Sequence, residues 1–273
     1  MGGLGNQLFI MARTFSLAKQ TGRQAVIHKP SIIHTPHSSQ HYEETVFKDY
    51  QTIDFEPTFT YREPVESCLL FCDTTKLVPI TTKHAHLTGY FQHPAYVDRD
   101  FVSTLSLPAV PLLQDTIFVH VRRGDYLDPD HNIHNINLTS PDNSYYPLAM
   151  NLARDFYSRR GKTVRFLVFS NDVVWCRTAW FFNSSDVSIF ESDNEVLTLA
   201  TMAACELGGI GANSSLSWWA AYLQKSLSNL VIFPHTWFSN DWKVDIWPSG
   251  SFKVSGTSSA TEYVMSTSPS SYC

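Results

Sequence analysis

Short apolar runs alternate with amphipathic segments through the second half of the chain. The runs are rich in Val, Ile and Phe and are bounded by polar turns, which is typical of buried strands, and we predict strands at 116–121, 164–170, 187–190, 209–212 and 230–233. Between them, apolar residues recur at spacings of three and four, which predicts helices at 145–156, 173–182, 195–207 and 216–227. Strands that alternate with helices over this length predict a parallel, Rossmann-like sheet.

The first half of the chain has a weaker pattern. A glycine-rich segment at 2–7 precedes an apolar helical pattern from Leu8 to Ala18, and a strand follows at 24–28. A strand normally leads into such a glycine-rich loop, so we expect that the first strand of this half is missing. Pro108 and Pro111 mark a domain boundary. We therefore expect an N-terminal Rossmann-like domain at 1–110, a C-terminal one at 111–248 and a disordered Ser/Thr-rich tail at 249–273.

Composition narrows the function classes. Of the 273 residues, 43% are hydrophobic and only 16% are charged, which indicates a folded chain with a substantial core. A net charge of −5 argues against a nucleic-acid or anionic-membrane surface, so any basic site must be local. The five cysteines include no C-x-x-C pair, which argues against a zinc site. No apolar run reaches membrane-spanning length.

Arg122 and Arg123 directly follow the predicted strand at 116–121. Ligands of open α/β sheets bind at the carboxyl ends of strands, and guanidinium groups bind phosphate oxygens bidentately. The pair therefore suits a diphosphate, held as part of a substrate or as a leaving group that gains charge, without a metal ion. The alternative from this stretch alone is a solvated loop or a surface ion pair.

A second polar turn, Asn213-Ser214-Ser215, falls between a predicted strand and a predicted helix. Free backbone N–H groups and hydroxyls at a helix start can bind an anion. A serine in this place is also an ordinary helix N-cap, and both roles can hold together.

Asp128 and Asp130 imitate a D-x-D motif, in which a divalent metal ion is chelated together with substrate phosphates. Because the neighbouring arginine pair would neutralise the same charge, we favour a site without a metal. The two carboxylates then become candidates for a general base, which must reach an acceptor hydroxyl. The alternative is that they are plain turn residues.

Several motifs together resemble glycosyltransferase family 11, the galactoside alpha-1,2-fucosyltransferases. They are GGLGNQLF at 2–9, GYFQ at 89–92, HVRRGDY at 120–126, FSND at 169–172 with Trp175, NSSLSWWAAYL at 213–223 and VIFPHTWF at 231–238. They come in the family's order and span nearly the whole family domain. The resemblance implies an α/β, GT-B-like fold in which two Rossmann-like parallel-sheet domains face each other across a cleft.

The resemblance also implies roles for individual residues. Arg122 would contact the donor diphosphate with Arg123 close by, while His120 and Asp125 would orient the arginines or contact the nucleotide. Asn6 would reach across the cleft towards the fucose–phosphate region. The implied catalytic set is Arg122, Asp125, Asp128 and Asp130; the implied donor-binding set is Gly5, Asn6, His120, Arg122, Arg123, Ser170, Asp172, Asn213, Ser214 and Ser215.

From this resemblance we expect an inverting, metal-independent enzyme that moves L-fucose from GDP-fucose to the 2-hydroxyl of a galactose-terminated glycan. No cofactor and no nucleic-acid partner are expected. Animal relatives work in the Golgi lumen behind an N-terminal membrane anchor and stem, neither of which this sequence shows, so we expect membrane contact only through an anchor that is absent here. The alternatives are a related fucosyltransferase with a core-glycan or protein-hydroxyl acceptor, and an inactive truncated family member.

Overall fold

The computed structural model describes residues 2–29, 41–56, 60–62, 82–129, 134–224, 229–240, 244–256 and 264–265. Backbone contacts divide the chain into two compact units. The first contains Met1–Pro108 and Trp242–Ile246, and the second contains Ala109–Asp241 and Trp247–Tyr272. Within the described ranges, no helix has both the length and the apolar character needed to cross a membrane.

The first unit contains one long helix, α1 (Leu4–Gln20), and two pairs of short parallel strands. The strands are β1 (Ile27–His28) with β2 (Thr52–Ile53), and β3 (Thr60–Arg62) with β4 (His86–Thr88). Helix α1 begins within the glycine-rich segment, so Gly5 and Asn6 lie in its first turns, and the expectation of a loop at 2–7 is wrong in part. Leu4 is completely buried, and this packing outweighs the low helix propensity of Gly5.

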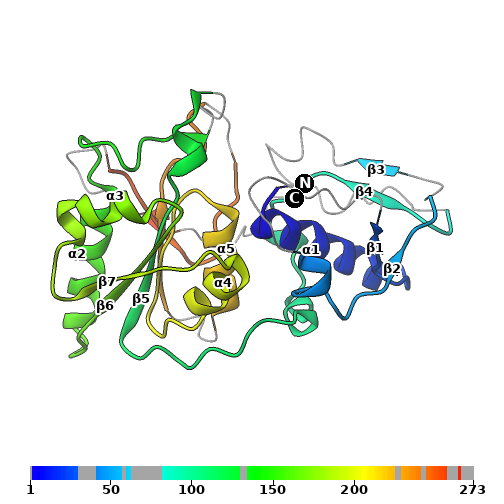
Figure 1. Ribbon diagram of the computed structural model, residues 1–273, viewed down its shortest axis with the longest axis horizontal. Coiled ribbons are helices and arrows are strands. Elements are labelled where there is room, and N and C mark those ends of the chain that lie inside the picture. Colours follow the sequence, from blue (N-terminus) through cyan, green and yellow to red (C-terminus); the bar gives the residue numbers. More distant parts are fainter. Residues whose placement is uncertain are drawn as a thin grey trace. The chain divides into compact units, whose positions relative to one another are not determined.

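A sheet of seven strands organises the second unit (Figure 1). Its order is β11-β10-β9-β8-β5-β6-β7, and all neighbours pair in parallel except β10 with β11. The bounds are β5 (Thr116–Val121), β6 (Arg165–Ser170), β7 (Val187–Phe190), β8 (Gly208–Ile210), β9 (Leu230–Pro234), β10 (Phe252–Val254) and β11 (Val264–Met265). This arrangement confirms the predicted α/β class with a Rossmann-like parallel sheet.

Helices cover both faces of this sheet. Figure 1 shows α2 (Tyr145–Ser158) and α3 (Val173–Thr178) on one side, with α4 (Glu195–Ala203) and α5 (Ser215–Leu223) on the other. The α2 face packs Tyr145, Tyr146 and Ala149 against alternate residues of β5, including Ile117 and Val119. Because both faces are covered, all six residues of β5 are buried, which is why this strand reads as a continuous apolar run.

The centre of the sheet depends on a close approach between neighbouring strands. A Cβ atom on Gly209 of β8 would lie 2.0 Å from the Phe118 ring of β5. Any larger residue at 209 would therefore overlap a fully buried ring in a close-packed interior. The glycine at this position is required by space rather than by backbone conformation.

The sequence prediction for the C-terminal tail is wrong in part. Strand β10 extends the sheet in register with β9, and Val264–Met265 forms the antiparallel edge strand β11, so these segments of 249–273 are not disordered. Val254 is buried, which gives the strand an apolar anchor in spite of its Ser/Thr-rich surroundings. Its pairing partner lies about twenty residues earlier, so local composition alone did not reveal it.

Candidate functional site

The order of strands in the second unit predicts where a ligand would bind. From β5 the chain winds outward through β6 and β7, then returns to β8 on the opposite side of β5. A crevice forms outside the carboxyl ends of two strands whose connections leave in opposite directions, and ligands of open α/β sheets bind there. The loop after β5 carries Arg122 and Arg123, and the loop after β8 carries Asn213 and Ser214. The two predicted loops therefore flank this topological switch point.

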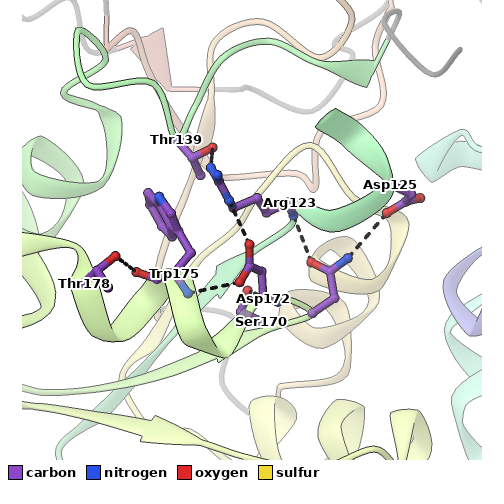
Figure 2. Close-up of polar contacts among 8 residues, drawn as sticks. Arg123, Asp125, Thr139, Ser170, Asp172, Trp175 and Thr178 are labelled. Atoms are coloured by element: carbon purple, nitrogen blue, oxygen red, sulfur yellow. Dashed lines mark hydrogen bonds and ion pairs between the residues drawn. The ribbon is translucent and has the colours of Figure 1, made fainter. Parts of the chain in front are cut away.

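Arg123 is held on several sides (Figure 2). Its Nε donates to Asp172 Oδ2 at 2.9 Å, and its Nη1 donates to Thr139 Oγ1 at 3.0 Å. The guanidinium carbon lies 4.8 Å from the centroid of the Trp175 ring, within the range of a cation–π contact. An arginine with this many constraints fixes the loop and has few donors left for a ligand.

Asp172 and Ser170 form the receiving side of this contact. Asp172 Oδ1 accepts the backbone N–H of Trp175 at 3.0 Å and so caps α3, while Oδ2 takes Arg123. Ser170 Oγ accepts the backbone N–H of Asp172 at 2.9 Å. Both residues were predicted to bind the donor, and in this structure their side chains hold the loop after β6 and Arg123 in place.

Arg122 is held more loosely than Arg123. Its Nη2 donates to Asp125 Oδ2 at 2.8 Å, and in the described part of the chain no hydrogen bond is found for its Nε and Nη1. The side chain is 24% exposed, so these donors can meet a ligand. Of the two adjacent arginines, Arg122 is thus the one available for binding.

The turn between the arginines and Asp125 requires a glycine. Gly124 has φ +20°, and a Cβ on it would lie 2.3 Å from Asn171 Nδ2. Asn171 occupies this space because its Oδ1 accepts the Arg123 backbone N–H at 2.9 Å, and its Nδ2 lies 3.4 Å from Asp125 Oδ1. Asn171 was not among the predicted site residues, although it belongs to the FSND motif.

His120 points away from the arginines, towards α5. It is 4% exposed, and its Nδ1 lies 2.5 Å from Ser217 Oγ, which also accepts the Ala212 backbone N–H at 3.1 Å. Burial, helped by the nearby Arg122 charge, lowers the pKa of His120 to about 3, so the ring is neutral at physiological pH. His120 therefore joins β5 to α5 rather than adding positive charge to the site.

Asn213 and Ser214 are structural anchors of the second loop. Asn213 is 2% exposed, and its Nδ2 donates to the carbonyls of His134 and Trp237, each at 2.8 Å. Ser214 is the N-cap of α5 and accepts the Leu216 backbone N–H at 3.3 Å. Ser215 is the first residue of that helix. The N-cap role considered for these serines is thus present at Ser214.

The acidic candidates do not gather into a metal site. Asp128 is exposed after a short 3-10 helix, η5 (Gly124–Leu127), and Asp130 lies outside the described residues. Among the described residues, no group of three His, Cys, Asp or Glu side chains could hold a metal ion. In the first unit, Asn6 Oδ1 accepts from Gln92 Nε2 at 2.6 Å, which links the GGLGNQ and GYFQ motifs.

Comparison with known proteins matches this region to a family. The model of glycosyl transferase family 11 matches residues 100–246, more than half of the chain. The chain is also similar to the Escherichia coli O-antigen biosynthesis glycosyltransferase WbnK, with 31% identity over 140 residues, 49% of this chain and 44% of the relative. An Escherichia coli alpha-1,2-colitosyltransferase is 28% identical over 130 residues, 46% of this chain and 42% of the relative. The alignments thus span less than half of either bacterial relative.

Two further similarities extend over more of the chain. The galactoside alpha-(1,2)-fucosyltransferase 2 of Bos taurus is 25% identical over 250 residues, 82% of this chain and 67% of the relative. Among solved structures, the fucosyltransferase NodZ from Bradyrhizobium covers 81% of this chain and 90% of its own, with a TM-score of 0.46 and 12% identity.

The buried state of His120 makes folding stability depend on pH. The unfolded chain takes up a proton on this ring below about pH 6.5, whereas the folded chain refuses it until about pH 3, so stability is lost as the pH falls. We expect His120 to contribute a loss of about 1.4 kcal/mol per pH unit below about 6.5. Urea unfolding at pH 7.5 and 5.5 should show a smaller loss in His120→Asn than in the unchanged protein. Equal losses in both would contradict the buried neutral ring.

Proposed function

We propose, because this chain belongs to glycosyl transferase family 11, that it transfers L-fucose from GDP-fucose to the 2-hydroxyl of a galactose-terminated glycan with inversion at the anomeric carbon. The bovine relative, named a galactoside alpha-(1,2)-fucosyltransferase, supports the donor sugar and the linkage. We place the reaction in the Golgi lumen, where the sequence resemblance puts animal members of the family.

One observation carries this proposal: a partly exposed arginine at the switch point of the sheet whose Nη2 is fixed by Asp125. Fucose leaves GDP through an oxocarbenium-like state, and negative charge grows on the departing diphosphate. Preorganised donors aimed at that charge are commonly the largest catalytic contribution. Arg122 would supply these donors, and Arg123, Asp172 and Trp175 would hold its loop so that little reorganisation is needed.

The remaining predicted residues enter the proposal with narrower roles. Asp125 would orient Arg122, because its carboxylate already accepts from that guanidinium. Asp128 and Asp130 are the candidates for a general base that takes the proton of the acceptor hydroxyl. Gly5 and Asn6 would contact the donor, as would the turn that contains Ser214 and Ser215. The charge of the diphosphate would be balanced by arginine, without a metal ion.

A second candidate concerns the sugar that is transferred. The Escherichia coli relative named alpha-1,2-colitosyltransferase favours a colitosyl donor over the same kind of diphosphate site. The diphosphate contacts would be shared, so the sugar pocket would decide between the two donors. A different acceptor, such as a core glycan or a protein hydroxyl, is also compatible with these contacts.

An assay of transfer tests the proposal. The purified chain is incubated with GDP-fucose and a galactose-terminated oligosaccharide, with and without EDTA, and the product linkage is read by NMR. We expect an alpha-1,2-linked fucose at equal rates in both samples, because the diphosphate is neutralised by Arg122. Transfer from a nucleotide-activated colitose alone would favour the second candidate. Transfer of neither sugar to any acceptor by a folded sample would contradict the proposed function.

Substitution of the two arginines should separate their roles. Arg122→Ala should lower the rate by about 10²–10³ while the unfolding free energy changes by less than about 1 kcal/mol, since only one partly exposed ion pair is lost. Arg123→Ala removes an ion pair, a side-chain hydrogen bond and a ring contact, and should cost about 1–3 kcal/mol of stability. Arg122→Lys keeps the charge without the fork and should be intermediate in rate. Full activity in Arg122→Ala would refute the mechanism.

A further inference from the structure

Tyr126 stands between the two loops that flank the switch point. It lies in η5, and the guanidinium carbon of Arg122 is 5.4 Å from the centroid of its ring. Its hydroxyl donates to the backbone carbonyl of Asn213 at 3.1 Å, across 87 positions of sequence. One side chain thus contacts the ligand-facing arginine of the first loop and the backbone of the second.

Tyr126 is braced by a closed ring of three contacts. The Tyr126 hydroxyl binds the Asn213 carbonyl, the Asn213 amide binds the His134 carbonyl at 2.8 Å, and the His134 ring stacks on Tyr126 at 5.2 Å with an interplanar angle of 20°. Each member is fixed by the other two, so the ring of Tyr126 has little freedom. Burial raises the pKa of Tyr126 to about 12, which keeps its hydroxyl protonated and able to donate at any physiological pH.

Arg122 needs such a surface. Its side chain has several rotatable bonds, and Asp125 fixes only one end of the guanidinium, through Nη2. An aromatic ring within about 6 Å attracts a cation and limits the positions it can take. A ring that is itself immobile converts this attraction into a defined orientation of the remaining donors.

We propose that Tyr126 is a positioning residue that sets the orientation of Arg122 towards a nucleotide diphosphate and couples that orientation to the loop after β8. The inference rests on the proposed function, since it names a residue that acts through Arg122. Tyr126 itself touches neither the donor nor the acceptor. Loss of its hydroxyl frees the ring from Asn213 and thereby loosens Arg122.

The experiment compares two tyrosines that each donate a hydroxyl to a backbone carbonyl. Tyr126→Phe removes the bond to Asn213, and the matched control Tyr157→Phe removes a bond to Leu207 on the opposite side of the sheet from any predicted ligand contact. Both variants should melt at lower temperature than the unchanged protein. Only Tyr126→Phe should also lower kcat/KM, by about ten-fold, and weaken the binding of GDP measured by calorimetry to a similar degree.

A double variant tests whether Tyr126 acts through Arg122. If it does, GDP binding to Arg122→Ala/Tyr126→Phe should be no weaker than binding to Arg122→Ala alone. The proposal is overturned if Tyr126→Phe binds GDP and turns over like Tyr157→Phe, or if the two losses multiply in the double variant. A chain that binds GDP but transfers no sugar would refute the proposed reaction, and the binding comparison would still decide the role of Tyr126. A chain that does neither would overturn both.

Discussion

The site of the second unit depends on the carboxylate of Asp172. One oxygen caps α3 and the other takes the Nε of Arg123, so a single side chain fixes the loop after β6 to the loop after β5. Neighbouring parallel strands bring the ends of β5 and β6 side by side, and the carboxylate turns that proximity into a fixed geometry. Charge-assisted contacts of this kind are stronger than neutral hydrogen bonds, and here the same group serves two of them.

This constraint divides the labour between adjacent arginines. Arg123 is committed to Asp172, Thr139 and Trp175, which leaves Arg122 as the mobile and partly exposed member of the pair. His120, two residues earlier, is buried and neutral, so it adds no positive charge that would compete with Arg122 for an anion. A sequence with three basic side chains in four positions therefore presents one cation to a ligand.

Much of the sheet could be predicted from the sequence, because its strands carry strong local signals. The strands at Thr116–Val121 and Val187–Phe190 were predicted with the observed bounds, since continuous apolar runs between polar turns mark strands covered on both faces. Helix α1 began earlier than predicted because the burial of Leu4 outweighs the glycines around it. Strand β10 was missed because its signal comes from the edge of β9, not from its own composition.

The candidate site was predicted by position but not by contact. The sequence placed both arginines and the Asn213 turn at strand ends, and the strand order brings those ends together. Spacing cannot show that Asn171 fills the space beside Gly124, or that the Tyr126 hydroxyl reaches Asn213, because such bonds join segments far apart in the chain. The motifs around FSND and HVRRGDY were the available signal, and they identify the segments without assigning roles to their members.

Calorimetric titration of the purified chain with GDP, with and without EDTA, tests most directly whether arginine alone holds the diphosphate. The account predicts the same dissociation constant in both samples, and weaker binding as the salt concentration rises, because the contact is between charges at a partly exposed site. Binding that disappears in EDTA and returns with added Mg²⁺ or Mn²⁺ would contradict it.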